Sequence, residues 1–196
     1  MTNRDIDMLT SEALGARLRE LREQSGRSLR ALSRELGISP SAVSQIERGA
    51  MRPSVSRLIA YVTALGVPLA AVFETGHEKP VEGPQGIAVR RSWEVAPILL
   101  GGGVTFRRLS PIQTPGVEFF ESIYPPGAES NAHGRLLRHV GYEVGTVTEG
   151  ELTIEFEREV VTLSVDDSIT FPCDRPHSIS NRSAAPAVAT WLIVHP

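Results

Sequence analysis

The spacing of apolar residues changes once along the chain, near Phe73. Before this point leucine, isoleucine and valine recur every three or four residues, which predicts amphipathic helices. Residues 75–86 (TGHEKPVEGPQG) are rich in glycine and proline and predict a linker. Beyond them apolar and polar residues alternate, which predicts short strands. The chain is therefore predicted to contain a disordered tail (1–10), a helical domain (11–74), the linker (75–86) and an all-β domain (87–196).

Residues 28–49 (SLRALSRELGISPSAVSQIERG) have the pattern of a helix-turn-helix. Gly37 interrupts the helical spacing, Ser39 is a predicted N-cap, and Pro40 suits the first position of a second helix. Short polar side chains then remain on the outer face, where a helix in the major groove contacts base edges. The predicted DNA-binding residues are Ser28, Ser39, Pro40, Ser41, Ser44, Gln45, Arg48 and Arg52. Among them Ser41, Ser44 and Gln45 are predicted to contact bases, whereas Ser28, Arg48 and Arg52 are predicted to hold phosphates.

The order of the apolar segments, with IERG closing the second helix of the motif, resembles the phage-repressor-like (Xre-type) DNA-binding domain from Leu14 to Phe73. The resemblance implies five helices and a structural ion pair between Arg22 and Glu47. Residues 11–66 contain nine arginines and five glutamates, a net charge of +4. Because the whole chain has a net charge of −3, the rest of the chain carries −7. A basic helical domain joined to an acidic remainder favours double-stranded DNA as a partner.

The second half of the chain predicts many short antiparallel strands, the pattern of a small barrel or jelly roll. The predicted strands are Val104–Leu109, Val117–Tyr124, Leu152–Phe156, Val160–Val165, Ile169–Phe171 and Val188–Val194. Two segments, HVGYEVGTVTEGEL from His139 and DDSITFPCDRPHSISN from Asp166, are similar to the two signatures of cupins, whose fold is an antiparallel β-barrel. One departure is Leu137, which stands where the cupin pattern has a histidine.

Three residues of these signatures are candidate metal ligands. His139 and Glu143 are an even number of residues apart, so on an extended strand both can point into the barrel, and His177 is predicted to begin a strand on the facing side. Two imidazoles and one carboxylate can hold Fe(II), Zn, Ni or Mn with positions left open. Because Leu137 replaces one ligand, the alternative is a pocket without metal, and His133 could serve as a substitute ligand.

Arginines near the expected mouth of the barrel are candidate contacts for an anionic effector, because guanidinium groups present paired donors to carboxylates and phosphates. These residues are Arg135, Arg138 and Arg175.

Two classes of function fit this domain order. The first is a transcriptional regulator that binds an operator, senses a small-molecule effector in the cupin domain and forms a homodimer through that domain. The second is an iron enzyme resembling hydroxypropylphosphonate epoxidase, which also places a repressor-like domain before a cupin. The intact ISPSAVSQIERG favours the regulator, without enzymatic activity. A single cysteine, a polar N-terminus and the lack of a long apolar run favour a cytoplasmic protein.

Overall fold

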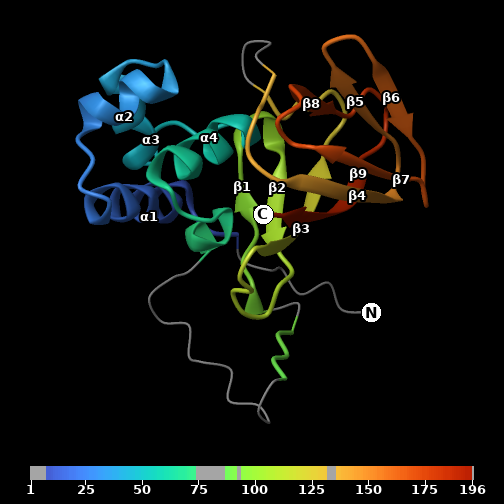
Figure 1. Cartoon of the computed structure of the whole chain (residues 1–196), viewed down its shortest axis with the longest axis horizontal. Coiled ribbons are helices and arrows are strands. Elements are labelled where there is room, and N and C mark those ends of the chain that lie inside the picture. Colours follow the sequence, from blue (N-terminus) through green and yellow to red (C-terminus); the bar gives the residue numbers. More distant parts are fainter. Residues whose placement is uncertain (1–7, 74–86, 92–93, 132–135, 196) are drawn as a thin grey trace.

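The computed structural model describes residues 8–73, 87–91, 94–131 and 136–195. Helices form one side of the molecule and strands the other, with α4 beside the strand domain (Figure 1). The predicted linker lies outside the described residues. Among the helices that are described, none has both the length and the apolar character needed to cross a membrane.

The N-terminal domain has four α-helices, not the five implied by the resemblance. They are α1 (Ser11–Gln24), α2 (Leu29–Leu36), α3 (Pro40–Glu47) and α4 (Val55–Leu65). In place of the fifth is the 3-10 helix η1 (Leu69–Phe73), whose five side chains are all buried. Because so short a segment cannot offset the cost of nucleating an α-helix, its conformation is set by packing.

Side-chain hydroxyls begin every α-helix of this domain. Thr10, Ser28, Ser39 and Ser54 each accept a hydrogen bond from the backbone amide three residues later. The ends of α2 and α4 are glycines in the left-handed conformation, at φ 63° and 70°. The helix boundaries therefore follow from local sequence, because serine, threonine and glycine are the residues that satisfy unpaired backbone groups at helix ends.

In its described residues the C-terminal domain consists of two antiparallel sheets that do not close into a continuous barrel, which corrects the predicted antiparallel β-barrel. Within the described residues its strands are β1 (Ile98–Leu99), β2 (Thr105–Arg108), β3 (Val117–Tyr124), β4 (Tyr142–Glu149), β5 (Leu152–Phe156), β6 (Val160–Leu163), β7 (Ser168–Pro172), β8 (His177–Ser180) and β9 (Ala187–Val194). One sheet has the order β1-β2-β3-β9-β4-β7 and the other β6-β5-β8. The short 3-10 helix η3 (Gly101–Gly103) connects β1 to β2.

The two domains pack against each other directly and share one cluster of buried apolar side chains. The amide of Ser56 in α4 donates to the carbonyl oxygen of Ser130 at 2.8 Å, and the amide of Gly101 donates to that of Pro53 at 2.8 Å. Leu9, within the segment predicted to be a disordered tail, forms a bridge with Ile98 of β1. The position of the helices relative to the sheets is therefore set by contacts between domains.

Candidate functional site

The predicted base-reading face lies on α3. Val43 and Ile46 are buried, so α3 packs its apolar side against the domain. Ser41 is exposed on the other side, and Ser44 and Gln45 are partly exposed. A short helix with small polar side chains on its free face is compatible with insertion into the major groove.

The remaining predicted DNA contacts lie at the edges of this face. Ser39 and Pro40 are exposed at the start of α3, and Ser28 is exposed at the start of α2. The guanidinium of Arg48 contacts the hydroxyl of Ser44. Arg52 is exposed, and its Nε donates to Ser11 Oγ at 2.9 Å. Helix N-termini and exposed guanidinium groups are suitable contacts for phosphates.

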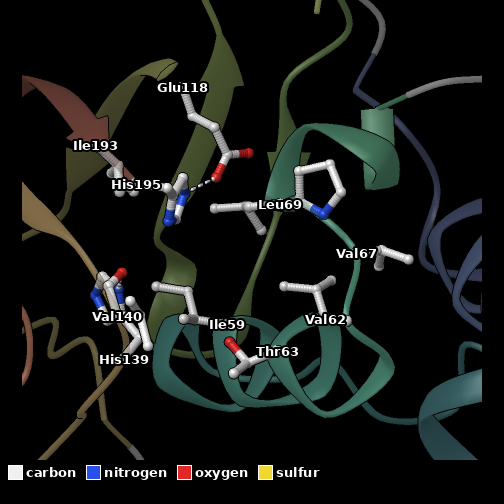
Figure 2. A pocket seen from close by; sticks show the side chains of 12 residues that line it. Ile59, Val62, Thr63, Val67, Leu69, Glu118, His139, Val140, Ile193 and His195 are labelled. Carbon is white, nitrogen blue, oxygen red and sulfur yellow. Dashed lines mark hydrogen bonds and ion pairs between the residues drawn. The ribbon is translucent and has the colours of Figure 1, made fainter. Parts of the chain in front are cut away.

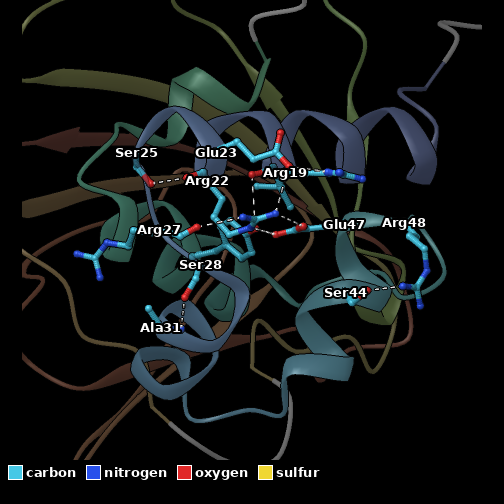
Figure 3. Close-up of polar contacts among 12 residues, drawn as sticks. Arg19, Arg22, Glu23, Ser25, Arg27, Ser28, Ala31, Ser44, Glu47 and Arg48 are labelled. Carbon is cyan, nitrogen blue, oxygen red and sulfur yellow. Dashed lines mark hydrogen bonds and ion pairs between the residues drawn. The ribbon is translucent and has the colours of Figure 1, made fainter.

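The two side chains that the resemblance pairs, Arg22 and Glu47, form a bidentate ion pair between α1 and α3 (Figure 3). Arg22 Nε lies 2.6 Å from Glu47 Oε1 and Arg22 Nη2 lies 2.9 Å from Oε2. The hydroxyl of Tyr61 in α4 also donates to Glu47 Oε1, at 2.6 Å. The hydrogen bond to Glu47 raises the pKa of Arg22, and burial raises the pKa of Tyr61. Glu47 therefore ties the end of α3 to two other helices.

A second contact that holds α3 was not predicted from the sequence. Gly15 of α1 faces the backbone at the end of α3, where an added Cβ would lie 2.5 Å from the carbonyl oxygen of Ile46. Within a leucine-rich helix this glycine has no local signal for its role, because the need for close approach arises only when the two helices pack.

In the cupin domain, the three candidate metal ligands converge. His139 Nε2 lies 2.9 Å from Glu143 Oε1, and His177 Nε2 lies 3.9 Å from the same oxygen. One potential ligand atom from each residue lies within 4.8 Å of the others. The residues are 9%, 4% and 2% exposed, respectively. His177 begins β8, as predicted.

The structure corrects how His139 reaches this cluster. His139 is not on the same strand as Glu143, because β4 begins only at Tyr142. The chain bends at Gly141, which has φ 115°, and an added Cβ there would lie 2.5 Å from the carbonyl oxygen of Val194. The bend brings two residues four positions apart into contact, whereas an extended strand would separate their Cα atoms by about 13 Å.

The chemistry of the donor set fits a divalent metal. His177 Nδ1 lies 2.8 Å from the carbonyl oxygen of Arg175, which directs the Nε2 lone pair toward the cluster. Burial lowers the pKa of His177, so its neutral, ligating form predominates at neutral pH. Leu137, which replaces the expected histidine, lines a cavity together with Glu143 and His177. Three protein donors, with no fourth beside them among the described residues, leave positions for an exogenous ligand.

Two of the three arginines predicted to bind an effector, Arg138 and Arg175, make other contacts. Arg138 Nε donates to the carbonyl oxygen of Asp174 at 2.9 Å. The guanidinium of Arg175 pairs with Glu159 and lies 4.2 Å from the centre of the Phe156 ring. We call His139, Glu143 and His177 the His–Glu cluster. Neither Arg138 nor Arg175 lines the cavity beside it. Arg135 and His133 lie outside the described residues.

Comparison with known proteins identifies both domains. Residues 13–73 match the family described as "Helix-turn-helix domain", and residues 120–193 match the "Cupin domain" family. The HTH-type transcriptional regulator PuuR of Escherichia coli is 31% identical over 185 residues, which cover 88% of this chain and 89% of that regulator.

Solved structures agree on the fold. The crystal structure of an HTH_3 family transcriptional regulator from Vibrio cholerae superposes with a TM-score of 0.68 at 23% identity, covering 95% of this chain and 97% of the other. Hydroxypropylphosphonic acid epoxidase from S. wedmorenis covers 94% of this chain, but its TM-score of 0.47 at 18% identity is too low to support the enzyme alternative. The sequence relative that covers 88% of this chain is a regulator, so the chain belongs to the HTH-type transcriptional regulators that join a helix-turn-helix domain to a cupin domain.

Proposed function

We propose that this regulator reads DNA with α3 and senses a small-molecule effector through a divalent metal held by His139, Glu143 and His177. The observation that supports the sensing site is the convergence of these three buried side chains within 4.8 Å. Two imidazoles and a carboxylate are compatible with Zn, Fe, Ni or Mn. A bound metal would offer its open positions to a nitrogen or oxygen atom of the effector.

Contacts within the protein orient the candidate ligand atoms. Arg175 fixes the ring of His177 through its carbonyl oxygen, and His139 Nε2 lies 2.9 Å from Glu143 Oε1. A divalent cation would compete with protons for these ligand atoms, so metal binding should weaken as the pH falls. Leu137 contributes an apolar wall in place of a ligand.

On the DNA side, Ser41, Ser44 and Gln45 would contact base edges, while Ser28, Arg48 and Arg52 would contact phosphates; Ser39 and Pro40 position the start of α3. A homodimer formed through the cupin domain would present two α3 helices to half-sites about 34 Å apart along the duplex. A regulator of genomic DNA with this design acts in the cytoplasm.

Native mass spectrometry of the purified protein, after loading with Zn²⁺, tests the metal site. We expect one ion per protomer in the wild type and in His195→Gln, which removes a histidine outside the cluster. His177→Ala and Glu143→Gln should lose the ion. Equal zinc content in all four proteins would contradict the assignment, as would its absence from the wild type. The same spectra report the dimer.

A further inference from the structure

The DNA-binding domain lines one side of the cavity at the His–Glu cluster. Glu143 and His177 line it from the cupin domain, and Val55 and Ile59 of α4 line it from the helical domain. Its volume is about 20 Å³. A space of this size holds roughly one water molecule, so an ion fits but an organic effector does not.

A second, larger pocket lies between the domains, next to this cavity (Figure 2). It measures about 290 Å³, near the lower end of small-molecule sites, which begin at about 300 Å³. Ile59 and Val62 of α4 form one wall, and His139 and Val140 of the cupin domain lie beside Ile59 (Figure 2). Ile59 and Ile193 line both spaces, and His139, which lines the larger one, lies 2.9 Å from Glu143 in the smaller one, so these three side chains lie between the two spaces.

The two isoleucines between these spaces differ in how firmly they are held. Ile193 belongs to β9, where it pairs with Glu118 of β3 on one side and Glu143 of β4 on the other. Ile59 belongs to α4, whose first turn is held to the cupin domain by the hydrogen bond from Ser56 to Ser130. Moving Ile193 would disrupt two strand ladders, whereas Ile59 can move with its helix.

Helix α4 also contacts the end of α3, the helix proposed to read DNA. Two residues beyond Ile59, the hydroxyl of Tyr61 donates to Glu47 at 2.6 Å. A displacement of α4 at Ile59 therefore acts on the residue that ends α3, because Tyr61 and Glu47 are both buried and their contact cannot be replaced by water without cost.

We propose that Ile59, a residue of the DNA-binding domain, blocks the route by which an effector in the interdomain pocket would reach the metal. This inference rests on the proposed metal site. The effector has a ligating nitrogen or oxygen atom at one end and an apolar body; it reaches the metal by displacing Ile59, and its body occupies the interdomain pocket. Binding shifts α4 on the cupin domain and thereby shifts α3.

Protein loaded with Co²⁺, whose visible spectrum reports its ligands, tests the proposal with 4-phenylimidazole as the probe. This molecule carries a ligating nitrogen and an apolar ring. Ile59→Ala should bind the probe at least about tenfold more tightly than the wild type, because no packed side chain must move. Val62→Ala is the matched control, since Val62 lines the interdomain pocket but not the cavity at the cluster; its affinity should equal that of the wild type.

Hydrogen exchange on the same samples supplies a second readout. Binding of the probe to the wild type should speed exchange of the Ser56 amide, which the contact with Ser130 protects. Equal probe affinity in Ile59→Ala and Val62→Ala, or no binding to either cobalt protein, would overturn the role of Ile59 while leaving the metal site intact. Failure of Co²⁺ to bind the wild type would overturn the metal site and this inference with it.

Discussion

Tyr61 of α4 donates a 2.6 Å hydrogen bond to Glu47, the last residue of the recognition helix α3. The same carboxylate oxygen accepts Nε of Arg22 from α1 at 2.6 Å. One buried side chain thus joins three helices. Because a buried carboxylate needs its partners in place, this contact fixes the position of α3 relative to α1 and α4.

Removing the positive partner should destabilise the helical domain strongly. Arg22→Met leaves Glu47 buried with one donor from Tyr61, and we expect a loss of about 3–5 kcal/mol in the free energy of unfolding, measured by urea denaturation. Arg19→Met is the control, because Arg19 pairs with the exposed Glu23 one turn away and should matter little. Similar losses in both variants would contradict the special role of Glu47.

Gly15→Ala should also destabilise the domain, although alanine is the better helix former. The new methyl group would lie 2.5 Å from Ile46 O and 2.8 Å from Glu47 O, so α1 and α3 must separate. We expect a loss of about 1–3 kcal/mol by the same denaturation measurement. Ala16→Gly, on the exposed side of α1, should lose only about 1 kcal/mol through helix propensity. A Gly15→Ala protein as stable as the wild type would show that the helices are not in close contact.

Two variants separate base reading from phosphate binding. Gln45→Ala should reduce discrimination at one base pair of a selected operator by about 1–3 kcal/mol, measured by fluorescence anisotropy on matched and mismatched duplexes. Arg52→Ala should weaken binding to all sequences alike and make affinity less dependent on salt. The assigned docking would be wrong if both variants bound the operator as the wild type does.

Stability should fall at alkaline pH. Burial raises the pKa of Tyr61 and of Tyr124, whereas tyrosines in the unfolded chain ionise at about pH 10. Above this pH the unfolded chain releases protons that the folded chain keeps, so the free energy of unfolding decreases as pH rises; below it the contribution is complete.

Urea denaturation across this range checks the sign. Tyr61→Phe should show a smaller decrease than the wild type, because one of the two groups is gone. Tyr142 is exposed, so the free energy of unfolding of Tyr142→Phe should decrease with pH as much as that of the wild type. A free energy of unfolding that stays constant through the range would rule out protected tyrosines.

Local sequence signals predicted the helical half well. Ser39, Pro40 and Gly37 define the turn of the helix-turn-helix, because capping depends on neighbours within one turn. The same holds for strands with clear alternation: β3 and β5 have the predicted ends. The fifth helix was wrong because the burial of η1, not its propensity, determines its conformation.

The candidate site was only partly predictable. Its three ligand residues are found in two sequence signatures, but the bend at Gly141 that brings His139 to Glu143 depends on packing against Val194. The contribution of Val55 and Ile59 to the cavity has no signal in the sequence, because their helical spacing is that of any buried face. Contacts between domains arise from tertiary structure, which local patterns do not encode.

The most direct test of the account is the affinity for a selected operator duplex, measured by fluorescence anisotropy before and after addition of Zn²⁺ with 4-phenylimidazole. We expect the dissociation constant of the wild type to change at least about fivefold, the lower end of usual coupling between sites. His177→Ala should bind DNA like the untreated wild type and show no change. An unchanged wild type, or an equal change in His177→Ala, would contradict the claim that the His–Glu cluster controls DNA binding.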